Sequence, residues 1–93
     1  MDEQLEIEKL KSEGYDKVWV YEAEPDEIDE SHSHDYDTKL IILRGEISVA
    51  FKTGDAILNK SYVVGDEVVI SKNKSHSAKV GPSGCRYIVA EKN

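Results

Sequence analysis

Short apolar runs separated by turn-forming residues limit the kinds of fold that this chain can adopt. From residue 17 onward, β-branched and aromatic residues gather in short runs that are interrupted by Gly, Pro, Asn and Asp. No helical period of apolar residues returns after Gly14. Short strands at regular spacing, with turn signals between them, indicate an all-β sandwich or barrel.

The positions of these turn-forming residues predict about seven strands. Their expected ranges are 17–23, 38–45, 46–52, 56–64, 67–71, 76–80 and 85–91. We expect turns at Gly45, at 53–55, at 65–66, at 72–74 and at 81–84, where Gly, Asp and Asn gather. The acidic segment 24–30 contains Pro25 and is expected to be a connection without strand structure.

The first 14 residues differ in pattern and predict a short helix. Asp2 can cap its N-terminus, Leu5, Ile7 and Leu10 form an apolar stripe, and Gly14 ends it. A chain of 93 residues supports one hydrophobic core. We therefore expect a single domain in which the segment 1–14 packs on a barrel formed by 15–93.

The charge of the chain argues against anionic partners. Acidic residues outnumber basic ones by 19 to 12, which gives a formal net charge of −7 and a field that repels nucleic acid and anionic membranes. No apolar stretch reaches the roughly 20 residues of a membrane span, and the acidic N-terminus is unlike a signal peptide. The single Cys85 cannot form an intramolecular disulfide and is expected to be a small buried residue. These features predict a cytoplasmic location.

The three histidines of the chain, His32, His34 and His76, form the most informative set of polar residues. On a strand, the spacing of His32 and His34 points both imidazoles to the same face, where they can share one ion. Neutral imidazole suits the divalent ions of Fe, Zn, Ni, Cu and Mn. The alternative is that His32 and His34 belong to a solvated polar loop and that His76 is an ordinary residue at a strand end.

The spacing of these histidines and two glycines resembles the paired motifs of the cupin family. The first motif has a His-x-His pair, three residues, a glutamate, six residues and a glycine, and His32, His34 and Gly45 match it. In the second motif ten residues separate a glycine from the last histidine, as they separate Gly65 from His76. The resemblance covers about residues 26–80. It implies a jelly-roll β-barrel that holds one divalent transition metal ion on the three histidines.

Four positions depart from the cupin pattern. The first glycine of the family falls on Asp26, the proline of the second motif on Ser71, and its second glycine on Asn73. Asn tolerates a left-handed backbone better than other non-glycine residues, so the loop before the last histidine can still turn. The glutamate ligand of the family falls on Thr38, which is not a usual metal ligand.

The threonine leaves three interpretations of the site open. Three histidines can be the only protein ligands, which leaves the ion its full charge as a Lewis acid with open positions for water or substrate. A nearby carboxylate can replace the glutamate instead. Asp37 faces away from Thr38 on a regular strand, and Asp35 reaches the site only with irregular backbone. In the third interpretation the site binds no metal.

The residues around the histidines predict a substrate pocket. If Thr38 points inward, Leu40 and Ile42 do so as well, which makes the cavity behind the metal apolar. Arg86 and Tyr87 lie on opposite faces of the last strand, and the sequence does not decide which face is internal. An inward Arg86 would bind a carboxylate, whereas an outward one would be a solvated charge.

Two kinds of function fit this site. One is a metal-dependent oxygenase or isomerase that acts on a small oxygenated substrate, a carboxylate or a dicarbonyl compound. The other is a non-catalytic module that binds a metal ion or a small ligand, and a barrel with histidines of no function is a further possibility. Cupins host many functions, so the fold does not choose among them. We also expect a homodimer that pairs through an edge strand or the N-terminal segment.

Overall fold

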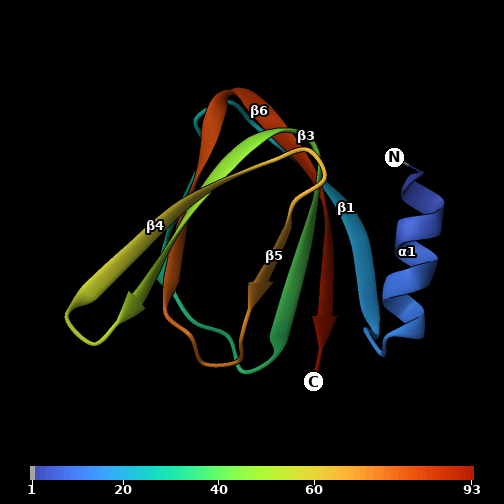
Figure 1. Cartoon of the computed structure of the whole chain (residues 1–93), viewed down its shortest axis with the longest axis horizontal. Helices are drawn as coiled ribbons and strands as arrows, with labels where there is room; N and C mark the ends of the chain where they lie inside the picture. The colour runs from blue at the N-terminus through green and yellow to red at the C-terminus, as the bar shows by residue number, and fades with distance from the viewer. Residues whose placement is uncertain (1) are drawn as a thin grey trace.

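The computed structural model describes residues 2–93 and contains one short helix and an antiparallel set of six strands. In chain order, the elements are α1 (Glu3–Ser12), β1 (Lys17–Ala23), β2 (Ile28–His32), β3 (Asp37–Thr53), β4 (Ala56–Val63), β5 (Glu67–Ile70) and β6 (His76–Lys92). The arrangement confirms the prediction of an all-β jelly roll with a short N-terminal helix (Figure 1).

Two long strands, β3 and β6, pair with each other and run through the whole molecule. Near one end of this pair, β1 adds to β6 and β5 adds to β3; near the other end, β2 adds to β6 and β4 adds to β3. One buried cluster takes side chains from both halves of β3, including Leu40 and Ile42 before the bend and Ile47 and Val49 after it. The two halves of the pair therefore fold over a common core, as in a β-sandwich.

The β3–β6 pair bends at Gly45. The register shifts between Ile42 and Arg44 and again between Gly45 and Ile47. Gly45 has φ +80°, and a Cβ atom there would lie 2.0 Å from the carbonyl oxygen of Gly84. Only glycine fits this close approach of two backbones.

Two turns predicted from the sequence are bends inside continuous strands. The segments 38–45 and 46–52 are one strand, β3, and the segments 76–80 and 85–91 are one strand, β6. Those two predictions were wrong because glycine permits a sharp bend without ending the ladder of hydrogen bonds. The other expected strands are present, with ends that differ by one residue at most.

The acidic segment after Pro25 also differs from its prediction. It was expected to be a connection, but β2 begins within it at Ile28 and pairs with the start of β6. The first four residues of β2 are exposed, so the strand lacks the alternation of apolar and polar residues by which strands are recognised.

Helix α1 packs on the outer face of the sheet beside β1 (Figure 1). The carboxylate of Asp2 caps it by accepting a hydrogen bond from the backbone N–H of Leu5 at 3.2 Å, as predicted. Leu10 is buried in a second apolar cluster, which also contains Tyr15, Ile88 and Ala90. This cluster fixes the outward face of β6 and so determines which side chains of that strand point inward. Within residues 2–93, no helix has the length and apolar content needed to cross a membrane.

Candidate metal centre

Three chain segments bring the histidines together. His32 ends β2, His34 follows in the link to β3, and His76 begins β6. The β2–β6 register places His32 directly opposite His76. One ring nitrogen from each of the three side chains lies within 4.8 Å of the other two, so the three nitrogens converge on one small region of the structure.

Backbone carbonyl groups orient two of the imidazoles. Nδ1 of His76 donates a hydrogen bond to the carbonyl oxygen of Lys74 at 2.9 Å, and Nδ1 of His32 donates to the carbonyl oxygen of Glu30. A carbonyl oxygen only accepts, so Nδ1 carries the proton in both rings. In the neutral rings Nε2 therefore keeps a free lone pair, as in metal sites whose ligands are oriented by a second hydrogen bond.

His34 is held by the loop that precedes His76. Its carbonyl oxygen accepts a hydrogen bond of 2.7 Å from the backbone N–H of Asn73. Burial and the neighbouring His32 and His76 lower the pKa of His34, which favours the neutral form that binds metals. Among residues 2–93, its buried Nδ1 has no hydrogen-bond partner.

A small cavity of about 120 Å³ adjoins the histidines. It is lined by Asp29, His32, His34, Thr38, Leu40, Ile47, Val49, Ile70, His76, Ala78, Tyr87, Val89 and Glu91. The floor is apolar, and the hydroxyl of Thr38 is buried in it without a hydrogen-bond partner within the described chain. The volume is well below the roughly 300–1,000 Å³ of sites for drug-sized molecules, so the cavity suits a ligand of few atoms.

The structure brings most, but not all, of the predicted pocket residues to this cavity. Thr38, Leu40 and Tyr87 line it. Ile42 is fully buried deeper in the same core cluster and is not among the lining residues. Tyr87 faces inward because Ile88 and Ala90, on the opposite face of β6, are covered by the helix.

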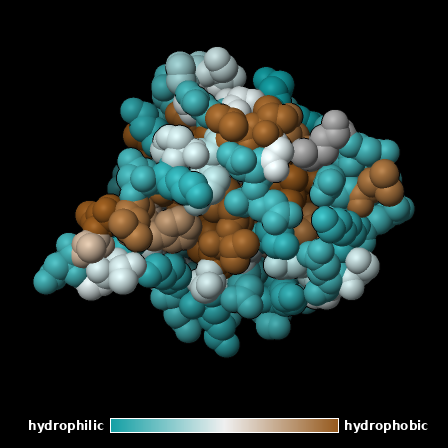
Figure 2. All heavy atoms as spheres, in the orientation of Figure 1, coloured by the Kyte–Doolittle hydropathy of each residue, from teal (hydrophilic) through white to brown (hydrophobic). Residues whose placement is uncertain are grey.

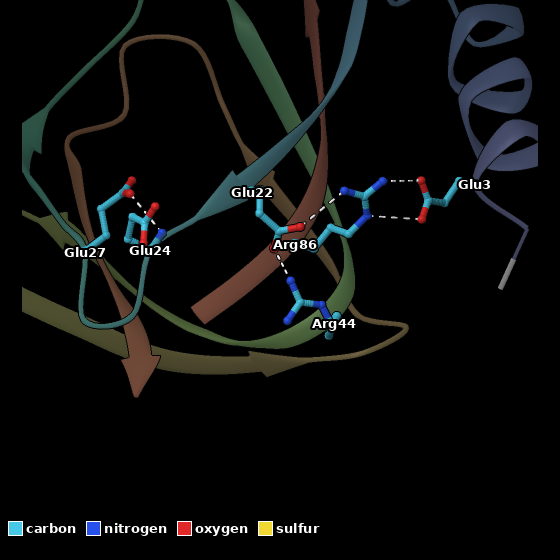
Figure 3. Close-up of polar contacts among 6 residues, drawn as sticks. All are labelled: Glu3, Glu22, Glu24, Glu27, Arg44 and Arg86. Atoms are coloured by element: carbon cyan, nitrogen blue, oxygen red, sulfur yellow. Dashed lines mark hydrogen bonds and ion pairs between the residues drawn. The ribbon is translucent and has the colours of Figure 1, made fainter. Parts of the chain in front are cut away.

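Arg86 lies on the outer face of β6, away from the histidines. Its guanidinium donates to Glu3 on the helix at 2.9 Å and to Glu22 on β1 at 3.3 Å (Figure 3). Arg44 binds the same Glu22 carboxylate from β3. Arg86 therefore connects α1 to the sheet and, contrary to the expected substrate pocket, does not line the histidine cavity.

The lone thiol does not offer a second reactive group. Cys85 is fully buried in the core cluster. Burial raises its pKa to about 11, so the thiol stays protonated at neutral pH. The position fits the expectation that Cys85 acts as a small apolar residue.

Comparison with known proteins identifies the fold. No protein-family model and no curated protein matches the chain. Among solved structures, the CENP-C cupin domain of Drosophila melanogaster matches with a TM-score of 0.74 at 14% identity, over 83% of this chain and 57% of that one. A cupin-2 domain protein from Shewanella frigidimarina matches with a TM-score of 0.67 at 22% identity, over 82% and 69% of the two chains. The chain has the cupin fold.

A larger cupin also matches. Oxalate decarboxylase of Bacillus subtilis, an enzyme with Mn(II) centres, has a TM-score of 0.77 at 15% identity, over 94% of this chain and 23% of that one. The chain spans only 57–63% of the length of the Drosophila CENP-C chains that it matches. The similarities therefore extend to one barrel.

The backbone supports the alignment with the cupin motifs. The two positions where this chain replaces a family glycine, Asp26 and Asn73, have φ values of +61° and +64°. The two retained glycines, Gly45 and Gly65, also have positive φ values, of +80° and +91°. All four positions thus adopt the left-handed backbone that glycine favours, which Asp and Asn tolerate best among other residues.

Sequence reasoning missed two acidic residues of the cavity, Asp29 and Glu91. Asp29 lies on the strand that was predicted to be a connection. Glu91 shares a strand face with Tyr87 and Val89, so the alternation of β6 would have found it once the internal face was known. That face is decided by the packing of the helix.

Proposed function

We propose that this cupin binds one divalent transition metal ion through His32, His34 and His76. The convergence of three imidazole nitrogens within 4.8 Å supports the proposal. The donor set fits such an ion, because two rings are oriented by backbone carbonyls and the pKa of the third is lowered towards the neutral form. Imidazole ligands suit Fe, Zn, Ni, Mn or Cu.

The proposed reaction is that of a metal-dependent oxygenase or isomerase with a small carboxylate or dicarbonyl substrate. An ion held by neutral ligands supplies Lewis acidity to an oxygen ligand. The apolar floor of Leu40, Ile70 and Val89 excludes water, and the buried hydroxyl of Thr38 can hydrogen-bond a polar atom of the substrate. The alternative, a non-catalytic binder of a metal ion or small ligand, needs the same cavity but no turnover.

Metal analysis of the purified protein tests this proposal. We expect one equivalent of a transition metal per chain after purification without chelator, or after titration of the chelated protein. A chain that takes up no Zn²⁺, Mn²⁺, Fe²⁺, Ni²⁺ or Cu²⁺ would contradict it. Oxygen consumption by the Fe²⁺ form with 1,3-diketones, thiols and small hydroxy acids, together with assays for isomerised products, then separates an enzyme from a binder.

We further propose that two copies pair through β4. Within the described chain this strand pairs only with β3 and protrudes as a hairpin (Figure 1), on which apolar side chains gather at the surface (Figure 2). Ile57 and Leu58 near its tip are 69% and 65% exposed. An edge strand with exposed apolar residues is a template for pairing with a second chain.

Light scattering tests the assembly. At micromolar concentration we expect about twice the 10.5 kDa mass of one chain. Leu58→Lys should shift the protein to a monomer, because two copies would then bring like charges together at the shared edge. Leu5→Lys is the matched control, since Leu5 is 63% exposed on the helix. Dissociation by the Leu5 change alone would assign the interface to the N-terminal segment instead.

A further inference from the structure

This chain lacks the glutamate of the first cupin motif, but other carboxylates line the same cavity. The glutamate of the motif is replaced by Thr38, and neither of the two aspartates that precede it in the chain compensates. Asp37 accepts a hydrogen bond at 2.8 Å from the backbone N–H of Lys72, and neither Asp35 nor Asp37 is among the lining residues. In residues 2–93, the acidic side chains that line the cavity are Asp29 and Glu91.

Glu91 lies opposite Thr38, the position at which the motif has its glutamate. The register of β3 and β6 pairs Thr38 with Glu91. Directly opposed residues in antiparallel strands have Cβ atoms about 4.5–5.5 Å apart. The carboxylate of Glu91 can therefore reach the part of the cavity that a glutamate at position 38 would reach. Both side chains line the histidine cavity, where Glu91 follows Tyr87 and Val89 on the internal face of its strand.

The surroundings of Glu91 connect it to the histidines. Tyr36 lies near this carboxylate, since burial first and Glu91 second raise the pKa of the tyrosine. The ring of Tyr36 in turn packs on His34, with ring centroids 4.7 Å apart. Glu91 and His34 also line the same cavity.

Asp29 is a weaker candidate. It lies on the exposed edge of β2, where solvent screens its charge, whereas Glu91 is half-buried. A charge in a partly desolvated site interacts more strongly with a cation than a charge in water does.

We infer that Glu91 supplies the carboxylate of the metal site in place of the glutamate missing at Thr38. The inference rests on the proposed metal function. The nitrogen atoms that converge belong to the three histidines alone, so Glu91 acts as the negative partner beside them. It lowers the cost of placing a divalent cation in an apolar cavity and thereby raises the affinity for the ion.

Titration of the chelated protein with Zn²⁺ and Mn²⁺ tests this inference. Glu91→Gln should weaken binding by about 10–100-fold, the range for residues beside metal ligands, while one ion per chain is still bound. Glu8→Gln, which removes the same charge from the exposed face of the helix, should bind like the unmodified protein. Equal affinities of the two variants would overturn the role of Glu91. Absence of binding by the unmodified protein would instead overturn the proposed metal site.

A double variant that moves the carboxylate from position 91 to position 38 provides a second test. In the double variant Thr38→Glu/Glu91→Gln, the carboxylate moves across the strand pair, and we expect affinity within a few-fold of the original protein. Thr38→Gln/Glu91→Gln is the matched control and should stay weak. A folded transfer variant that binds no better than its control would contradict the equivalence of the two positions. If circular dichroism shows that the transfer variant is unfolded, the comparison of the Glu91 and Glu8 variants decides.

Discussion

Replacing His76 with alanine is expected to abolish stoichiometric metal binding. His76 is only 4% exposed, and its Nδ1 is held by the carbonyl of Lys74, so the lone pair of Nε2 is fixed before an ion arrives. Removal of a residue that merely supports a metal ligand costs about 10–100-fold in affinity, and loss of a buried ligand should exceed this range. Isothermal titration with Zn²⁺ measures the change.

Stability provides a second measurement of the same variant. An ion that binds only the folded chain stabilises it by about 2.7 kcal/mol when its concentration is 100 times the dissociation constant. This stabilisation should appear in the original protein and vanish in His76→Ala. Val49→Ala truncates another side chain of the cavity and should retain both the binding and the stabilisation. Undiminished Zn²⁺ affinity in His76→Ala would show that the ligands have been assigned wrongly.

The Gly45→Ala substitution is expected to cause the largest loss of stability. The φ of +80° costs a residue with a Cβ about 1–2 kcal/mol. The new Cβ would also lie 2.0 Å from the carbonyl oxygen of Gly84 and 3.0 Å from Cα of Cys85, so the two central strands must move apart. Overpacking of this kind adds about 1–3 kcal/mol, which is a large part of the roughly 5–15 kcal/mol that stabilises a domain.

Urea denaturation of Gly45→Ala and Gly54→Ala separates the two costs. Gly54 has a similar φ of +60°, but a Cβ atom there would meet no atom within 4 Å. Its substitution should therefore lower the free energy of unfolding by the backbone term alone, about 1–2 kcal/mol. Equal losses in the two variants would show that the close approach of β3 and β6 contributes nothing. The bend also positions the cavity, so Gly45→Ala should weaken metal binding, whereas Gly54→Ala should not.

The strand pattern was largely predictable because it depends on local chemistry. Lys17–Ala23 reads as a strand from its β-branched and aromatic residues alone, and the structure has a strand with the same ends. The bends at Gly45 and Gly84 were not predictable as bends. A glycine in a strand pattern signals either a turn or a kink, and only the presence of a partner strand on both sides of it decides between them.

The cytoplasmic location and the absence of nucleic-acid and membrane partners stay predictions from charge and composition. The division into a helical segment 1–14 and a barrel 15–93 stays a proposal in the same way, although α1 and its cap lie inside the first range.

Residue types and their spacing were enough to predict an all-β chain, a short helix before the barrel, and three histidines at the spacing of the cupin motifs. These properties depend on residue type and spacing along the chain, so they can be predicted without the structure. The orientation of β6 became known from the folded chain, in which Tyr87 and Glu91 face the cavity while Arg86 faces the helix. The alternation of side chains along a strand assigns each residue to one of two faces, but it does not say which face is internal. That choice is made by the long-range packing of Leu10 and Tyr15 against Ile88 and Ala90, between residues far apart in the chain.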